Sequence, residues 1–167
     1  MSAFSPTYQG TIDVPMLPSD FTDRIARRVE TGLLVPGSRR RANYVVSSKS
    51  ADSVAFTAIG FWTAYNIGLN DVLLQRAGPK SIGYQGRFWR WATFAAVQAF
   101  VIALVILAVI LFLPSARAQV NADSWGWLFI AILLAFFGLI WPWILVAMHR
   151  RFAARALERI VRQVVAA

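Results

Sequence analysis

Residues 91–113 read WATFAAVQAFVIALVILAVILFL, an unbroken apolar segment that contains no charged residue. A stretch of about 18 or more such residues predicts a membrane-spanning helix. At about 1.5 Å per residue the segment reaches about 34 Å, which is enough to cross a hydrocarbon core of about 30 Å. We therefore predict a first transmembrane helix over residues 91–113.

A second apolar segment, WGWLFIAILLAFFGLIWPWILVAM, follows at residues 125–148 and also carries no charge. The segment between them, residues 114–124, is short and polar, so we expect a tight outer loop and a two-span helical hairpin. Pro142 lies inside the second segment, where its ring would clash with the carbonyl of Gly138. We therefore expect a kink between these two residues.

The composition agrees with a membrane location. The chain has 167 residues, of which 57% are hydrophobic and 15% are charged, whereas soluble domains carry about 25% charged residues. Cysteine is absent, which excludes disulfides, cysteine-bound metals and thiol nucleophiles. His149, the single histidine, falls at the end of the second apolar segment, where we interpret it as an interfacial anchor.

The flanks of the two segments set the expected orientation. Basic residues precede the first segment and follow the second, whereas the connecting loop has Arg117 alone. The positive-inside rule then places both termini in the cytoplasm, and we expect a bacterial plasma (inner) membrane. The basic residues expected at anionic lipid headgroups, with ordinary solvated charge as the alternative, are Arg39, Arg40, Arg41, Arg87, Arg90, Arg150, Arg151, Arg155 and Arg159.

Aromatic residues lie at both ends of the predicted spans. Trp and Tyr side chains favour the membrane–water interface, so they act as anchors there. The expected interfacial anchors are Trp89, Trp91, Trp125, Trp127, Trp141 and Trp143. Residues 83–94, GYQGRFWRWATF, interleave aromatics with arginines, a pattern also found in nucleic-acid binding. Because this stretch leads directly into the first span, we place Phe88 in the aromatic belt too and predict no nucleic-acid partner.

The first 88 residues predict a separate cytoplasmic α+β domain. Residues 1–18 hold three prolines and no periodicity, so we expect an irregular arm. Residues 19–34 predict a helix, with Ser19 as N-cap, an apolar stripe at four-residue spacing, and Pro36-Gly37 after its end. The stripe comprises Phe21, Ile25, Val29 and Leu33.

Residues 41–49, 53–68 and 71–88 are rich in β-branched and aromatic residues, which favour strands. We expect the domain to span residues 19–88, with a turn at 77–80. A helix over residues 54–75 lying on the membrane is the alternative. Gly83 and Gly86 are expected to set the flexibility of the link between this domain and the first span.

Residues 149–167, HRRFAARALERIVRQVVAA, predict a basic amphipathic helix. Its apolar side has two expected places. In the first, the apolar side is expected to lie at the acyl boundary of the membrane. In the second, it is expected to pack on the cytoplasmic domain or on a partner.

Small residues in the spans predict helix packing, because they let helix backbones approach closely. Ala95, Ala99 and Ala103 share one face of the first span. Ala103 is expected to contact the second span, while Ala95 and Ala99 stay available to another subunit. Gln98 is expected to form an interhelical hydrogen bond. The complete set of expected packing or partner positions is Ala95, Gln98, Ala99, Ala103, Ala131, Ala135 and Gly138.

The sequence shows no catalytic constellation. Neither apolar segment holds a carboxylate, and no phosphate-binding glycine motif occurs. We predict no catalytic residue, no metal site and no cofactor. The expected function is a non-catalytic accessory, scaffold or assembly subunit of a larger inner-membrane complex for secretion, conjugation, respiration or envelope assembly. The expected partners are the membrane and other membrane subunits or further copies. An oligomeric small transporter or channel is the alternative.

Overall fold

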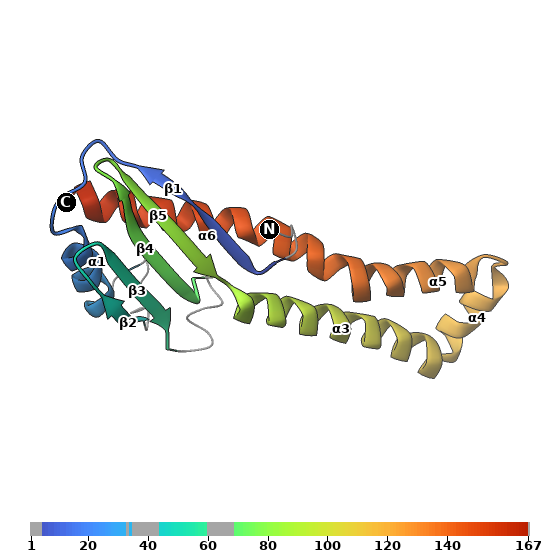
Figure 1. Cartoon of the computed structure of the whole chain (residues 1–167). Coiled ribbons are helices and arrows are strands. Elements are labelled where there is room, and N and C mark those ends of the chain that lie inside the picture. The colour runs from blue at the N-terminus through green and yellow to red at the C-terminus, as the bar shows by residue number, and fades with distance from the viewer. Residues whose placement is uncertain (1–4, 33, 35–43, 60–68, 167) are drawn as a thin grey trace. The chain divides into compact units, whose positions relative to one another are not determined.

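The computed structural model describes residues 5–32, 34, 44–59 and 69–166 (Figure 1). The chain divides into two compact units. The first, the sheet unit, comprises Met1–Trp91 together with His149–Ala167. The second, the helical unit, comprises Ala92–Met148. The sheet unit is therefore built from two separate stretches of the sequence.

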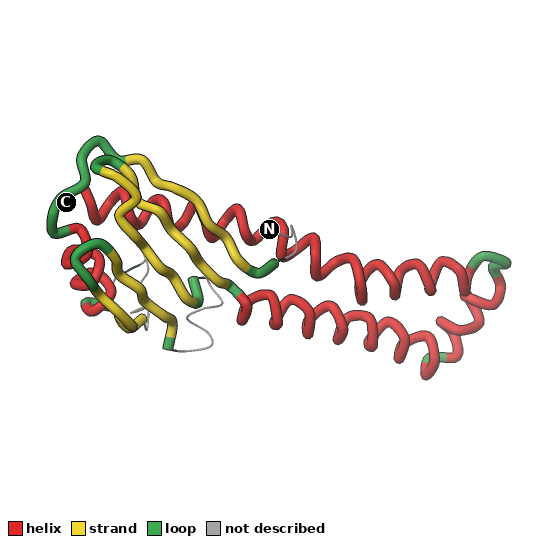
Figure 2. Tube along the Cα trace, viewed as in Figure 1, coloured by secondary structure: helices red, strands yellow, loops and turns green. Residues whose placement is uncertain are grey.

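The sheet unit contains five antiparallel strands in the order β1-β5-β4-β3-β2 (Figure 2). They are β1 (Thr7–Asp13), β2 (Tyr44–Lys49), β3 (Ser53–Ala58), β4 (Asp71–Gly78) and β5 (Ser81–Arg87). A small antiparallel sheet with helices confirms the expected α+β composition, and the turn expected at 77–80 is confined to residues 79–80, between β4 and β5. The alternative of a membrane-surface helix over residues 54–75 is wrong for residues 54–58 and 71–75, which belong to β3 and β4. Residues 60–68 lie outside the described residues.

Strand β1 corrects the irregular arm expected over residues 1–18 at Thr7–Asp13, while residues 14–18 are irregular as expected and residues 1–4 lie outside the described residues. Thr7–Asp13 pairs with β5 along its whole length, from Thr7 opposite Arg87 to Asp13 opposite Ser81. Tyr8 and Ile12 are buried on the covered face of the sheet. Gly83 and Gly86 also lie within paired β5 rather than in a flexible link. Pro6 and Pro15 flank this strand, so its short pattern of buried and exposed residues does not stand out in the sequence.

Helix α1 (Phe21–Glu30) covers β2 and β3 with the expected stripe, since Phe21, Ile25 and Val29 are fully buried. Leu33 and Pro36-Gly37 lie outside the described residues. The N-cap is Asp20 and not Ser19, and it makes no side-chain cap. Its carboxylate instead accepts a hydrogen bond from Arg24 Nε at 2.9 Å.

Helix α6 (Trp141–Ala166) is continuous from the second apolar segment into the sheet unit. Ala153, Leu157, Ile160 and Val161 are buried there. Of the two places expected for the apolar side of residues 149–167, the structure has the one packed on the domain. The apolar side of α6 therefore contributes to the core of the sheet unit, together with α1 and the sheet.

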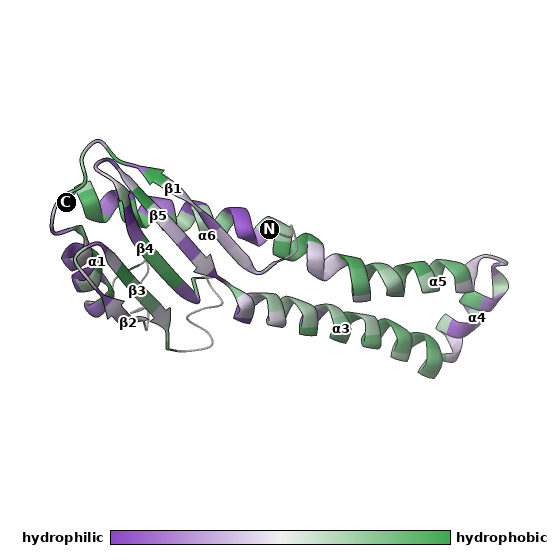
Figure 3. Ribbon diagram, viewed as in Figure 1, coloured by the Kyte–Doolittle hydropathy of each residue, from purple (hydrophilic) through white to green (hydrophobic). Residues whose placement is uncertain are grey.

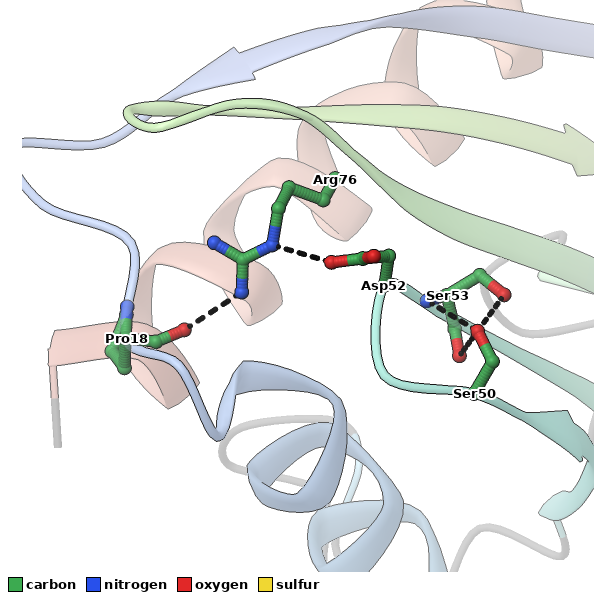
Figure 4. A network of polar contacts seen from close by, with 5 residues as sticks. All are labelled: Pro18, Ser50, Asp52, Ser53 and Arg76. Carbon is green, nitrogen blue, oxygen red and sulfur yellow. Dashed lines mark hydrogen bonds and ion pairs between the residues drawn. The ribbon is translucent and has the colours of Figure 1, made fainter.

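Arg76 on β4 ties three parts of the sheet unit together (Figure 4). Its Nε donates to Asp52 Oδ1 at 2.9 Å, and its Nη2 donates to the carbonyl of Pro18 at 3.3 Å. The guanidinium also lies over the ring of Phe21, 5.1 Å from its centroid. Ser50 and Ser53 close the adjacent turn through their hydroxyls at 2.8 Å. One side chain thus connects β4, the β2–β3 turn and the entry to α1.

The helical unit follows α3 (Trp89–Phe112) outward, turns through α4 (Pro114–Ala122), and returns along α5 (Gly126–Ala135) and η1 (Phe136–Ile140) into α6 (Figure 1). Two helices, Trp89–Phe112 and the continuous Gly126–Ala166, are long and apolar enough to cross a membrane (Figure 3). The loop expected at 114–124 is largely helical. Pro114 starts it, because a proline at the first helical position sacrifices no hydrogen bond.

The returning helix changes geometry where we expected a kink. Phe136–Ile140 forms a π-helical turn directly before Pro142. Proline has no N–H to donate to the carbonyl four residues earlier, so an α-helical bond to Gly138 is not available. The helix therefore continues past Pro142 with a wider, π-helical turn at Phe136–Ile140.

Replacing Gly86 with alanine should destabilise the sheet unit by about 1–3 kcal/mol, because a Cβ there would run into the ring of Tyr8. The matched control is Gly83→Ala on the same strand, where a Cβ would meet its nearest atoms at 3.8 Å. Thermal unfolding of the full chain in detergent measures both. Equal stability of the two variants would contradict the close packing of Tyr8 on Gly86.

Replacing Tyr8 with phenylalanine should stabilise the chain by about 1 kcal/mol at neutral pH. The buried hydroxyl has no hydrogen-bond partner among the described residues. Burial raises the pKa of Tyr8 above its ordinary value, and Tyr44 follows the same direction for the same reason.

The pH dependence has a defined sign. The folded state holds the Tyr8 proton more tightly than the unfolded state, so stability falls as pH rises above about 10, the pKa of an unfolded tyrosine. Tyr8→Phe should therefore move alkaline unfolding to higher pH. Tyr84→Phe, at a more exposed tyrosine, should move it less; the reverse order would refute the burial argument.

Candidate functional site

The chain leaves the sheet unit through Phe88, which joins β5 to α3. Phe88 is 0% exposed, and its N–H donates to the carbonyl of Pro6 at 2.9 Å. Its ring centroid lies 6.1 Å from that of Tyr8 and 5.6 Å from that of His149. The aromatic belt expected for Phe88 is therefore wrong, since this ring belongs to the core of the sheet unit.

Asn70 caps the start of α3 from a distant part of the sequence. Its side-chain oxygen accepts the N–H of Arg90 at 2.9 Å, which is one of the donors that the first turn of a helix leaves without an intrahelical partner. Its N–H donates to the carbonyl of Arg87 at 2.9 Å, and its own carbonyl accepts from Ala58 at 2.8 Å. Asn70 is 1% exposed. The first turn of α3 is thus bonded to the sheet unit.

Arg90 adds a second connection at the same place. Its Nη1 donates to the carbonyl of Ala58 at 2.9 Å, and its guanidinium lies 5.4 Å from the centroid of the Trp89 ring. The residue was expected at lipid headgroups. In the structure its side chain is held at the end of β3, where a charged donor strengthens the bond to a carbonyl.

Trp91 and His149 meet where the two stretches of the sheet unit begin and end. Their rings are stacked, with centroids 4.0 Å apart and an interplanar angle of 9°. His149 also packs against Phe88, as described above. We name Asn70, Phe88, Arg90, Trp91 and His149 the junction cluster. It holds the start of α3 next to the part of α6 that begins at His149.

The predicted packing residues of α3 face in two directions. Ala95 and Ala99 are 1% and 0% exposed, so they are covered within the chain and do not remain available to another subunit as expected. Ala103 is half-buried. Gln98 is exposed, and its side-chain amide has no hydrogen bond to any described residue. Gln98 therefore forms no interhelical bond within the described part of the chain, and a bond to a helix of another molecule stays a prediction.

The predicted partners on the second segment also differ from expectation. Ala131 and Ala135 are exposed, and Gly138 is half-buried with no atom within 4 Å of a Cβ built on it. They do not pack closely on Ala103. Gly126, which was not predicted, is the position where two helices approach, because a Cβ there would run into the backbone of Val120 on α4.

The basic residues predicted at headgroups are distributed over the surface of the sheet unit. Arg87, Arg151, Arg155 and Arg159 are exposed, and Arg150 is half-buried. Arg39, Arg40 and Arg41 lie outside the described residues. Headgroup contact by any of them stays a prediction.

The predicted interfacial tryptophans fall into two groups. Trp125 is largely exposed and Trp89, Trp127 and Trp143 are about half exposed, while Trp91 and Trp141 are more buried. The indole N–H of Trp127 donates to Asn121 at 2.8 Å, which links α5 to α4. Their position at a membrane interface also stays a prediction.

Among the described residues, no three carboxylate or histidine side chains gather in a way that could hold a metal ion. The junction cluster positions helices and contains no nucleophile beside a base. Comparison of the chain with protein-family models, with curated proteins and with solved structures found no match. The functional argument therefore rests on the geometry alone.

Replacing Asn70 with alanine should weaken the first turn of α3 by about 1–2 kcal/mol, because the Arg90 N–H loses its side-chain acceptor. Hydrogen exchange of the Arg90 amide should accelerate with it. The control is Thr57→Val, which removes the hydroxyl that donates to the Asn70 carbonyl at 3.1 Å and to Asp71 Oδ1 at 2.6 Å but leaves the cap in place. Faster exchange at Arg90 in the control as well would refute a specific cap.

Proposed function

We propose that this protein is an integral, two-span membrane protein that acts as a non-catalytic accessory, scaffold or assembly subunit of a larger inner-membrane complex. Support comes first from the surface of the helical unit. Large apolar side chains on both long helices, such as Val97, Phe100 and Phe129, are more than half exposed. Water does not favour an apolar surface of this extent, so a bilayer or a partner is expected to cover it.

Gln98 is the observation that carries the subunit role. It lies about 14 Å along α3 from Trp89, at about 1.5 Å per residue. In a bilayer this depth falls within the hydrocarbon, where a polar side chain without a partner is costly. Because the amide faces outward, a helix of another molecule can supply the missing hydrogen bonds.

The junction cluster supports a structural rather than a chemical task. It holds both points at which the chain enters and leaves the sheet unit, and it uses rings, a cap and a carbonyl bond. On this proposal the sheet unit lies in the cytoplasm, as the basic flanks indicate. The protein then presents a cytoplasmic platform fixed to a membrane anchor.

The oligomeric channel remains the second class of function. A pore lining requires rings of polar or charged side chains, and the two apolar segments hold no charged residue. Gln98 is the one strongly polar side chain deep in the first segment. A channel would therefore need Gln98 from every copy to face a shared axis.

Intact-particle mass after gentle detergent extraction tests the proposal. We expect a stable heteromeric particle in the wild type. Gln98→Leu should weaken the association of the other subunits about fivefold, because one interhelical polar contact contributes on the order of 1 kcal/mol. The control is Val101→Leu, at an exposed apolar position of the same helix.

A lone monomer in the same extract would refute the subunit role. A homo-oligomer that conducts ions in liposomes, with conduction abolished by Gln98→Leu, would instead establish the channel.

A further inference from the structure

We infer that a cleft between α1 and the end of α6 is the docking site for an acidic, partly apolar peptide segment of a partner protein. This inference rests on the proposed subunit function and names the chemistry of its partner. The cleft lies wholly within the sheet unit and has a volume of about 620 Å³.

The rim of the cleft is cationic. Arg24, Arg27 and Arg28 line it from α1, against one lining carboxylate, Asp20. Asp20 accepts from Arg24 at 2.9 Å and lies 3.8 Å from Arg27. Arg28 forms no ion pair with any described residue. Arg24 and Arg27 thus share the Asp20 carboxylate, and Arg27 also lies near Asp23 and Glu30, so the local excess of positive charge rests on Arg28.

The other acidic residues of this helix do not correct that excess. Neither Asp23 nor Glu30 lines the cleft; both line a neighbouring hollow that Arg27 shares, where Asp23 is bonded to Lys49 at 2.7 Å. On α6, Glu158 is bonded to Arg162 at 2.8 Å and does not line the cleft. Among the described residues no carboxylate pairs with Arg28, so its charge is available to an occupant of the cleft.

The floor of the cleft is apolar. Leu34, Ile160 and Val164 line it, and the half-buried Val164 has the most apolar surface left to contact an occupant. An occupant that satisfies both parts needs carboxylates for the rim and apolar side chains for the floor. Guanidinium groups bind carboxylates through paired, charge-assisted hydrogen bonds, which suits glutamate and aspartate.

The open shape favours a peptide over a small ligand. Pockets for small molecules bury about 70–90% of the ligand, whereas this cleft is open to solvent between two helices. A peptide laid along a groove between helices requires no such enclosure. Ile160 also lies about 16 Å along α6 from His149, at about 1.5 Å per residue, which separates the floor from the apolar segment.

A second copy of the chain is a poor occupant. The sequence has 17 basic and 8 acidic residues. Two copies would bring positive surfaces together, and like charges in an interface oppose binding. The charge of the cleft therefore points to a different protein.

The test uses the full chain in nanodiscs of zwitterionic lipid and a fluorescein-labelled helical peptide with glutamates on one face and leucines on the other. Fluorescence anisotropy should report binding that falls with salt and weakens about tenfold in Arg28→Glu. Arg28→Gln should weaken binding less. Circular dichroism establishes that each variant is folded.

The matched control is Arg155→Glu, the same charge change at an exposed position of α6 outside the cleft, which should bind as the wild type does. An equal loss in this control would overturn the inference, because general electrostatics would then explain binding. Equal binding of a peptide with serines in place of leucines would also overturn it, since the floor would have no role.

Phosphatidylglycerol vesicles distinguish the remaining occupant. Capture of these vesicles through Arg28, without binding of the peptide, would assign the cleft to lipid headgroups and overturn the inference. The intact-particle mass is measured separately. A heteromeric particle with no peptide binding would reject the cleft alone, whereas a monomer would reject the subunit role itself.

Discussion

The stacked rings of Trp91 and His149 close the sheet unit. The unit is assembled from residues before 92 and after 148, so its core is complete only when these two points of the chain are together. Holding the ends of a long intervening segment together costs conformational entropy. The stack at 4.0 Å, the buried ring of Phe88 and the Asn70 cap all oppose that cost at the same place.

This closure explains why the end of α6 has an apolar side. Leu157 and Val161 are fully buried in the sheet unit, so they are core residues that happen to follow an apolar helix in the sequence. A basic amphipathic segment beside a predicted span is typical of a membrane-surface helix. Here the same periodicity serves the domain, and the arginines on the other side remain exposed.

The predictable parts of the structure are those determined by local sequence. The two long apolar helices follow from composition alone, and Phe21, Ile25 and Val29 define α1 by their spacing. These features need no knowledge of distant residues. The strand-rich character of residues 44–58 and 71–87 follows from β propensity in the same way.

The parts that sequence analysis missed depend on contacts across the chain. Strand β1 is stabilised by pairing with β5, far away in the sequence. The cap of α3 comes from Asn70, on the loop before β4. The direction of Gln98 depends on which side of α3 is covered, and both sides of this helix have nearly the same hydropathy. Composition cannot distinguish them, because the helix is apolar all round.

On the proposed function, the two partner surfaces strengthen one another. Gln98 contributes only a modest interhelical contact, and the arginine-rimmed cleft binds through an open, solvated rim. A single partner carrying both a membrane helix and an acidic cytoplasmic segment would engage the second site after the first at a high effective concentration. Its combined affinity would then exceed either contact alone. Proteins that carry only one of the two features would bind weakly, which is how two unremarkable surfaces select one partner.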